Sequence, residues 1–446
     1  MKNKFRKNLL IAAAVIMVIF SATIGNGKAY EVNKSEKLPT KANAAGIETA
    51  EGVIESDGDM IYGDVDLGLD SSATLTDAEL AELSTAEIRE AATEEVEEYT
   101  EPDILDTMTL EEKVAQMFII TPEALTDSDG VTMAGEQTKA AIDETPVGGI
   151  IYMGDNLQAK TQVQEMLSNT NRYSEERVGL PMFLCVDEEG GSVARVAGSG
   201  RFDVKNVGNM SDIGAQGSVQ DAKEAGETIG SYLSELGFNV DFAPVADVLT
   251  NPDNSIVKTR SFGSDSDKVS DMSIAMADGL KEEGLEAVYK HFPGHGATAG
   301  DTHLGAAFTD KTADELSMSE LVPFQDAIND GANFIMVSHI SAPGITGHDT
   351  PASLSEILVN DILRSRMGYD GIVITDAMEM GAISKKYTSD EAACLAIKAG
   401  VDIILMPEDF HLAYNGVLDA VRSGEISEER INQSVARILK VKQEIE

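Results

Sequence analysis

The chain has 446 residues, of which 42% are hydrophobic and 25% are charged, so it can bury a sizeable core and is neither wholly disordered nor collagen-like. Against 34 lysine and arginine residues stand 77 aspartate and glutamate residues, which give a net charge of −43 at pH 7. A field of this sign repels a phosphate backbone, so we expect no nucleic-acid partner. The length allows two or three domains or one large α/β barrel.

The first 29 residues have the pattern of an export signal. Four basic residues precede an apolar stretch over 9–24, and Gly27 and Ala29 place small side chains at positions −3 and −1 of a cleavage site. As a helix this stretch spans ~24 Å, less than the ~30 Å hydrocarbon core, which favours a cleaved signal. We expect an exported protein, secreted or held at the cell surface, with a membrane contact only through an uncleaved N-terminal segment.

The segment 30–103 is strongly acidic. Residues 48–106 hold 20 acidic residues and one basic residue and so carry −19 of the net charge. This composition is typical of a flexible, solvated spacer. Thr76 and Glu79 form a capping-box pattern, which predicts one short helix within 76–97.

From residue 104 onward, short apolar runs alternate with amphipathic helical stretches. The runs are QMFII (116–120), GGIIYM (148–153), PMFLCVD (181–187), FNVDFAPV (238–245), EAVYKHF (286–292), NFIMVSH (333–339), GIVITDAM (371–378) and VDIILMP (401–407). Glycine follows three of the helical stretches where a left-handed residue ends a helix, at Gly237, Gly284 and Gly400. Eight such units predict one (β/α)8 TIM barrel of the α/β class over 104–446, because a doubly wound sheet would need fewer strands or a second domain.

Polar residues follow five of these runs, at the end of the strands where the active site of a TIM barrel lies. They are Asp187, Asp247, Lys290 with His291, His339 and Asp376. Together they predict a polar pocket for a small molecule. Asp376 shares the strand parity of Ile372 and Ile374, which directs its carboxylate into the mouth if those two fill the interior. The alternative is that Asp376 caps the following helix.

The stretch YKHFPGHGATAGDTH holds three of the six histidines of the chain. A metal site is one interpretation, but glycine and proline make the stretch a loop, and neither a helical histidine pair nor a cysteine accompanies it. We therefore expect no metal. The alternative is that Lys290 and His291 donate hydrogen bonds to hydroxyl groups, while Asp301 orients His303 as a proton donor.

The chain resembles glycoside hydrolase family 3, and within it the single-domain β-N-acetylglucosaminidases of the NagZ type. The resemblance covers about 104–442 and rests on ILDTMTLEEKVAQMF, VDEEGGSVARV, TRSFGSD, KHFPGHG, the DTH loop and VITDAMEM. It implies that Asp376 is the nucleophile and His303 the acid/base, oriented by Asp301. It also implies that the sugar is contacted by Asp187, Arg195, Arg260, Lys290 and His291. From the residues alone, Arg260 could instead form a structural ion pair and Asp187 a helix cap.

The resemblance implies retaining hydrolysis of terminal β-linked N-acetylglucosamine from cell-wall (peptidoglycan) fragments, with β-N-acetylglucosaminide saccharides or muropeptides as substrates and no cofactor. One alternative is a β-N-acetylglucosaminide phosphorylase, because a neutral imidazole does not repel phosphate as a second carboxylate would. The others are a β-glucosidase or β-xylosidase on the same barrel, and a non-catalytic saccharide-binding barrel. The cytoplasmic forms of the family lack an export signal and an acidic spacer, so their presence here favours activity outside the cell membrane. The sequence leaves the oligomeric state open, with a monomer favoured.

Overall fold

The computed structural model describes residues 104–298, 302, 305 and 307–445, together with four short strands earlier in the chain. The chain divides into two units, 1–102 and 103–446. The predicted signal peptide at 1–29 and the predicted helix within 76–97 lie outside the described residues.

The first unit holds two antiparallel strand pairs. They are β1 (Lys41–Ala42) with β2 (Glu48–Thr49), and β3 (Glu51–Ser56) with β4 (Asp59–Asp64). Both pairs fall within the segment expected to be an acidic spacer, whose role stays a prediction.

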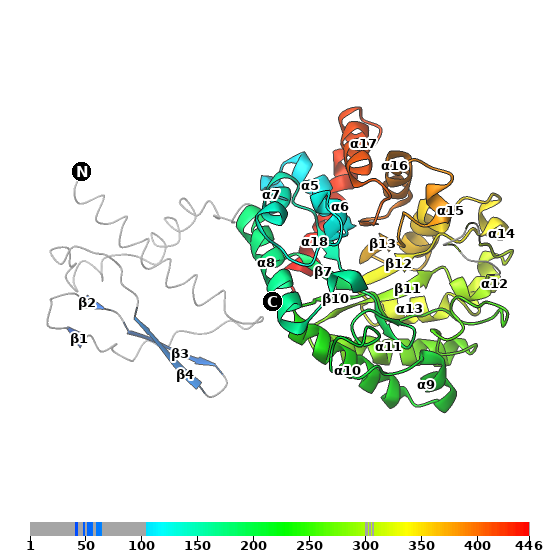
Figure 1. Cartoon of the computed structure of the whole chain (residues 1–446), viewed down its shortest axis with the longest axis horizontal. Helices are drawn as coiled ribbons and strands as arrows, with labels where there is room; N and C mark the ends of the chain where they lie inside the picture. Colours follow the sequence, from blue (N-terminus) through cyan, green and yellow to red (C-terminus); the bar gives the residue numbers. More distant parts are fainter. Residues whose placement is uncertain are drawn as a thin grey trace, which may run out of the picture. The chain divides into compact units, whose positions relative to one another are not determined.

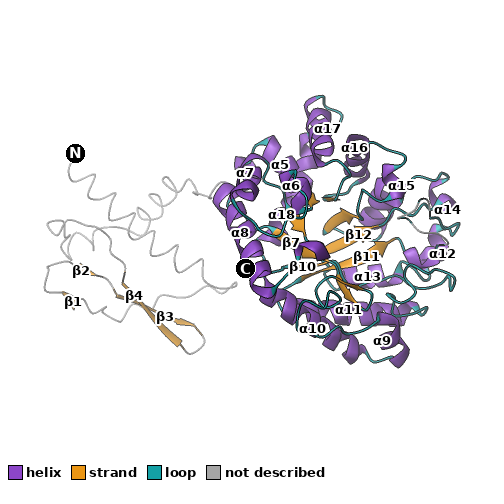
Figure 2. Ribbon diagram, in the orientation of Figure 1, coloured by secondary structure: helices purple, strands orange, loops and turns teal. Residues whose placement is uncertain are grey.

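The second unit is built around eight parallel strands, surrounded by helices (Figures 1 and 2). The strands are β5 (Phe118–Ile120), β6 (Gly149–Ile151), β7 (Phe183–Val186), β10 (Val240–Asp241), β11 (Glu286–Phe292), β12 (Phe334–Val337), β13 (Ile372–Thr375) and β14 (Ile404–Leu405). Their order in the sheet is β13-β12-β11-β10-β7-β6-β5-β14, and one parallel bridge between Ile374 and Ile403 joins the two ends. Each predicted run contains one strand, so the (β/α)8 prediction is confirmed.

Helices follow the strands along the chain. The longer ones are α5 (Leu110–Gln116), α7 (Glu136–Glu144), α8 (Lys160–Val178), α9 (Met210–Gln216), α10 (Val219–Leu236), α11 (Ser266–Glu282), α13 (Val322–Asn329), the π-helix η4 (Ile357–Arg366), α16 (Ser389–Ala399), α17 (Phe410–Arg422) and α18 (Glu428–Lys442). Shorter turns are α4 (Ile104–Thr107), α6 (Pro122–Thr126), η1 (Gly154–Asn156), η2 (His295–Ala297), α12 (Ala313–Ser317), α14 (Pro343–Thr346), η3 (Ala352–Leu354) and α15 (Gly381–Ser384). Within the described residues, none of the helices is long and apolar enough to cross a membrane.

The predicted helix ends agree with the structure. α10 and α16 end at Gly237 (φ 97°) and Gly400 (φ 111°), and both glycines are left-handed. α11 ends at Glu282, just before the left-handed Gly284 (φ 85°). α10 begins at Val219, where the Ser218 hydroxyl caps the helix by accepting a hydrogen bond from the N–H of Asp221.

Two glycines let α10 and α11 pack in close contact. A Cβ on Gly226 would lie 2.1 Å from the carbonyl oxygen of Met276, and a Cβ on Gly279 would lie 2.3 Å from that of Lys223. A larger residue at either position would therefore push the helices apart. Because α10 leads into β10 and α11 into β11, this contact fixes two strands whose ends carry polar residues of the mouth.

A buried lysine lies at the opposite end of the barrel. Lys442, in the last turn of α18, is 1% exposed, and its Nζ donates a hydrogen bond to the carbonyl oxygen of Pro181 at 2.7 Å, just before β7. The same nitrogen lies 4.9 Å from the centre of the Phe183 ring. Burial lowers the pKa of Lys442 to about 7.

Candidate active site

A cavity of about 340 Å³ opens at the mouth of the barrel. Six of the eight predicted site residues line it, namely Asp187, Arg195, Arg260, Lys290, His291 and Asp376. The other two, Asp301 and His303, lie outside the described residues. Thr302, between them, is described and lines the cavity. The barrel thus brings side chains that are far apart in the sequence into one pocket.

Asp376 follows β13, and its main-chain N–H donates to the carbonyl oxygen of Val337 on β12 at 2.8 Å. Its Oδ1 accepts a hydrogen bond from the N–H of Ala377 at 2.8 Å. The next helix, α15, has Met380 at its N-terminal cap, so the interpretation of Asp376 as a helix cap is wrong. Burial acts to raise the pKa of Asp376, but the His291 imidazole, the Ala377 N–H and the Lys290 ammonium outweigh burial and hold this pKa below its ordinary value. The carboxylate is therefore ionised.

Asp187 is the last residue before a short hairpin. β8 (Glu188–Gly190) pairs antiparallel with β9 (Val193–Ala194), so Asp187 does not cap a helix and that alternative is wrong. The hairpin returns the chain to its start, where Nη2 of Arg195 lies 3.6 Å from Oδ2 of Asp187. Buried Glu188 fixes the chain just after β9, since its carboxylate accepts hydrogen bonds from the N–H groups of Val196 at 2.7 Å and of Ala197 at 2.8 Å.

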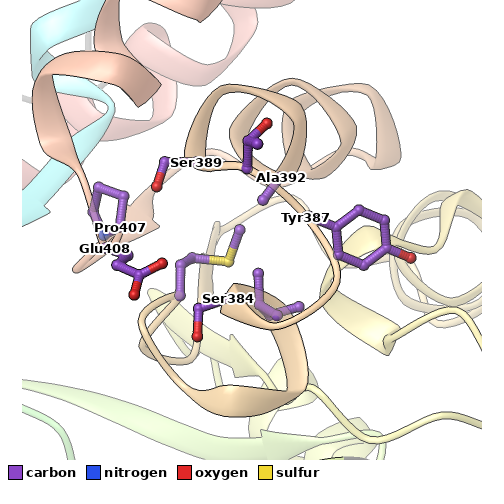
Figure 3. A pocket seen from close by; sticks show the side chains of 9 residues that line it. Ser384, Tyr387, Ser389, Ala392, Pro407 and Glu408 are labelled. Atoms are coloured by element: carbon purple, nitrogen blue, oxygen red, sulfur yellow. The ribbon is translucent and has the colours of Figure 1, made fainter.

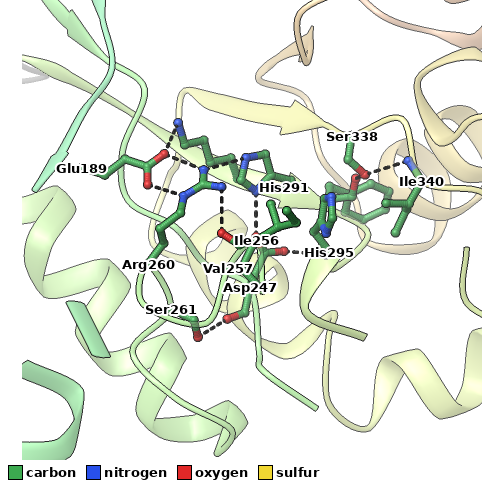
Figure 4. A network of polar contacts seen from close by, with 12 residues as sticks. Glu189, Asp247, Ile256, Val257, Arg260, Ser261, His291, His295, Ser338 and Ile340 are labelled. Carbon is green, nitrogen blue, oxygen red and sulfur yellow. Dashed lines mark hydrogen bonds and ion pairs between the residues drawn. The ribbon is translucent and has the colours of Figure 1, made fainter. Parts of the chain in front are cut away.

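A buried carboxylate that the sequence did not predict, Glu189, pairs with Arg260 (Figure 4). Glu189 is 2% exposed, and it receives two hydrogen bonds from Arg260, from Nε at 2.6 Å and from Nη2 at 2.7 Å. The Nζ of Lys290 lies 2.7 Å from Glu189 and 2.9 Å from Asp187. Burial acts to raise the pKa of Glu189, but Arg260 and Lys290 hold it far below its ordinary value. Arg260 thus forms the structural ion pair considered above and lines the pocket as well.

The residue spacing in DEEGG gave a signal for Glu189. Asp187 and Glu189 are two positions apart, so in extended chain they share a face. Together with the cations of Arg260 and Lys290 the two carboxylates form one side of the pocket, which we call the charged wall. Its two negative and two positive charges cancel.

His291 is oriented from behind by Asp247. The Nδ1–H of His291 donates to Oδ2 of Asp247 at 2.7 Å, and Oδ1 of Asp247 accepts the N–H of His295 at 2.6 Å. The Nε2 of His291 then lies 3.3 Å from Nη2 of Arg260, which is a donor. A register shift in β11 between Lys290 and Phe292 lets two consecutive side chains reach the pocket. Asp247 is fully buried behind this wall rather than in the pocket.

Thr302 is held from two sides. Its Oγ1 lies 3.3 Å from Nε2 of His295, and its carbonyl oxygen accepts the N–H of Ala382 in α15 at 3.1 Å. These contacts attach Thr302 to His295 in η2 and to Ala382 in α15. His295, like Glu189, was not assigned a role from the sequence.

Comparison with known proteins decides the family. Residues 109–441 match the model of the glycosyl hydrolase family 3 N-terminal domain. The chain belongs to glycoside hydrolase family 3. The resemblance drawn from the sequence motifs is confirmed, and the barrel is the glycosidase domain of this family.

Individual members of family 3 are similar over most of the barrel. The chain is 35% identical over 343 residues to Beta-hexosaminidase LpqI of Mycobacterium tuberculosis, covering 74% of this chain and 82% of that protein. It is 32% identical over 326 residues to Beta-hexosaminidase A of Pseudoalteromonas piscicida, covering 68% of this chain but only 54% of that protein. The solved structure of a family 3 β-N-acetylglucosaminidase from Paenibacillus sp. str. FPU-7 has a TM-score of 0.71 and 37% identity, covering 76% of this chain and 62% of that one. The chain thus spans about half the length of one relative and most of another.

The barrel has a second, much smaller hollow (Figure 3). Met378 lines it, whereas the neighbouring residues Ala377 and Glu379 line the large cavity. Hydroxyl groups and the exposed carboxylate of Glu408 surround it. Its volume of about 10 Å³ is that of a single water, so it cannot hold a sugar ring.

Proposed function

We propose that the chain is a retaining exo-β-N-acetylglucosaminidase that forms a covalent glycosyl-enzyme on Asp376. One observation carries the assignment of the nucleophile. The two carboxylates of the charged wall, Asp187 and Glu189, are each paired with a lysine or arginine. Asp376 lines the same pocket, is ionised, and among the described residues makes no ion pair. Glu379 also lines the pocket, but partial burial and the neighbouring Glu408 carboxylate raise its pKa, whereas the pKa of Asp376 is lowered. Asp376 is therefore the carboxylate that is best suited to attack a substrate.

The reaction has two steps in this proposal. Asp376 attacks the anomeric carbon as the bond to the leaving oxygen breaks, and His303 gives its proton to that oxygen. His303 then takes a proton from water, whose oxygen attacks the anomeric carbon and returns the bonding electrons to Asp376. Asp301 orients the imidazole of His303. Two displacements at one carbon retain the β-configuration, and neither step needs a cofactor.

The pocket supports recognition of one terminal sugar. A volume of about 340 Å³ lies at the lower end of the range for small-molecule sites, which favours removal of single residues from a chain end. Asp187 can accept hydrogen bonds from adjacent hydroxyls, and Arg195, Arg260, Lys290 and His291 supply the other polar contacts. The Nε of Arg195 is buried and has no partner among the described residues, which leaves a donor for substrate. The relatives named beta-hexosaminidase and β-N-acetylglucosaminidase support N-acetylglucosamine as this sugar.

We further propose that the natural substrates are peptidoglycan fragments, including muropeptides, met outside the cell membrane. The export pattern at 1–29 and the acidic segment 30–103 support this location. In this proposal the acidic segment is a spacer and the protein is a monomer.

The test compares aryl β-N-acetylglucosaminide with aryl β-glucoside, each with and without inorganic phosphate. We expect faster turnover of the N-acetylglucosaminide, free sugar as the product, and no sugar 1-phosphate. Asp376→Asn should abolish this turnover, whereas Glu408→Gln, at a carboxylate of the small hollow, should not. Sugar 1-phosphate as the main product would replace hydrolysis by phosphorolysis, and preference for the glucoside would overturn the sugar assignment. No turnover of either substrate would favour a saccharide-binding barrel.

A further inference from the structure

We infer that His339 is a positioning residue for the nucleophile, which it orients by hydrogen bonding to the main chain of Ala377. The inference rests on the proposed role of Asp376. His339 follows β12, the strand that pairs with β13, and Val337 is in register with Thr375. The imidazole is 1% exposed and does not line the substrate cavity. It therefore acts through the chain beside Asp376.

The first contact fixes which nitrogen of His339 carries a hydrogen. Its Nε2 lies 2.9 Å from the carbonyl oxygen of Ala377. A carbonyl oxygen only accepts hydrogen bonds, so Nε2 must be the donor. The chain beside the nucleophile is thereby attached to the end of the neighbouring strand.

The second contact selects this tautomer. The Nδ1 of His339 lies 2.8 Å from Oγ of Ser353, which is itself buried and held by a hydrogen bond from its N–H to the carbonyl oxygen of Ser338 at 3.0 Å. Burial lowers the pKa of His339, so the ring is neutral and Nδ1 carries no hydrogen. The Ser353 hydroxyl then donates to Nδ1 and leaves Nε2 as the protonated nitrogen.

These contacts have a consequence for the attacking oxygen. Ala377 accepts from His339 through its carbonyl group and donates from its N–H to Oδ1 of Asp376. Oδ1 is therefore occupied, while Oδ2 has no hydrogen-bond donor among the described residues. The arrangement leaves Oδ2 as the oxygen that attacks the anomeric carbon. Without the His339 donor, the Ala377 segment can rotate, and the carboxylate loses its fixed orientation.

The test uses two substitutions of His339 in the full chain. His339→Leu removes the donor, whereas His339→Gln keeps an N–H group at a similar distance from the main chain. With an activated aryl β-N-acetylglucosaminide, we expect His339→Leu to lower kcat roughly 100-fold with KM within threefold of wild type, because a displacement of ~1 Å has a cost of this size. His339→Gln should recover at least tenfold of the loss. Equal losses in both variants, a rise in KM in place of the fall in kcat, or an unchanged kcat in His339→Leu would overturn the inference.

A serine pair keeps the test informative if His339→Leu fails to fold. Ser353 and Ser338 are both fully buried, and each hydroxyl donates one hydrogen bond, to His339 from Ser353 and to the carbonyl oxygen of Phe292 from Ser338. Ser353→Ala should lower kcat about tenfold, and Ser338→Ala should leave it within twofold. Equal effects would overturn the inference. Activity in Asp376→Asn would instead refute the proposed function, whereas an inactive Asp376→Asn beside a normal His339→Leu would refute only the role of His339.

Discussion

Replacement of Glu189 by glutamine tests the charged wall of the pocket. The carboxylate is 2% exposed and is paired with Arg260 and Lys290, so glutamine at this position leaves the wall with one unbalanced positive charge. Lys290 keeps Asp187 at 2.9 Å, but the described contacts give Arg260 no second carboxylate within ion-pair distance. Removing one partner of a buried ion pair costs about 3–5 kcal/mol, and we expect Glu189→Gln to lower the free energy of unfolding by this amount at pH 7.

The pH dependence of this loss follows from the pKa of Glu189. In the folded chain this pKa lies far below the ordinary value of 4.5, so the unfolded chain takes up the proton first as the pH falls. The contribution of the carboxylate is therefore complete above pH ~5 and decreases below about pH 4.5. The difference between wild type and Glu189→Gln should accordingly shrink at pH 3.5.

Urea unfolding at pH 7 and pH 3.5 measures both effects. The matched control is Glu176→Gln, which breaks an arginine pair of 2.6 Å with Arg172 on the exposed face of α8. Exposed pairs contribute little, so this control should leave the unfolding midpoint unchanged within error. A loss in Glu189→Gln no larger than in the control would show that the buried pair with Arg260 does not stabilise the fold. A loss that grows at acid pH would contradict the direction of the pKa shift.

Three further predictions concern the acid/base, the nucleophile and the barrel base. His303→Ala should slow substrates with basic leaving groups far more than activated aryl substrates, because protonation of the leaving oxygen then limits the rate; equal losses would assign His303 to binding. Since the pKa of Asp376 is lowered, the acid limb of kcat/KM should lie below the ordinary aspartate value of 3.8, and an acid limb above that value would show that the carboxylate is not stabilised as described. As the pH falls, the unfolded chain takes up a proton at Lys442 before the folded chain does. Between pH 7 and 10 the free energy of unfolding therefore rises with pH, through Lys442, by up to ~1.4 kcal/mol per pH unit. Lys442→Met should remove this contribution, and an identical slope in both proteins would contradict it.

The barrel could be predicted because its strands are apolar on both sides. Every residue of β5, β6, β7, β12 and β13 is buried, so each strand stands out from the sequence as a continuous apolar run between helices. The glycines that end helices are also local signals, since a left-handed residue is needed at a fixed place. Such features depend on the chain nearby and not on distant partners.

The hairpin and the supporting residues of the site could not be predicted in this way. Glu189 lies in β8 as a buried charge, which is stable only because Arg260 arrives from 71 positions away. The same holds for His339, whose partners Ser353 and Ala377 lie 14 and 38 positions further along the chain. These residues depend on contacts between distant segments, which periodicity does not register. The family motifs predicted the six residues that line the pocket, but not the residues that hold them in place.

The residue to which the sugar becomes attached in a covalent intermediate identifies the nucleophile. An activated fluorinated N-acetylglucosaminyl fluoride, in which fluorine on the ring slows the second step, is incubated with the full chain, and the digested protein is analysed by mass spectrometry. We predict one added sugar on the peptide that contains Asp376, and none in Asp376→Asn. A sugar attached to Asp187 or Glu189 would contradict the assignment of Asp376 as the nucleophile. Turnover of the reagent without any adduct and with inversion at the anomeric carbon would contradict the covalent intermediate itself.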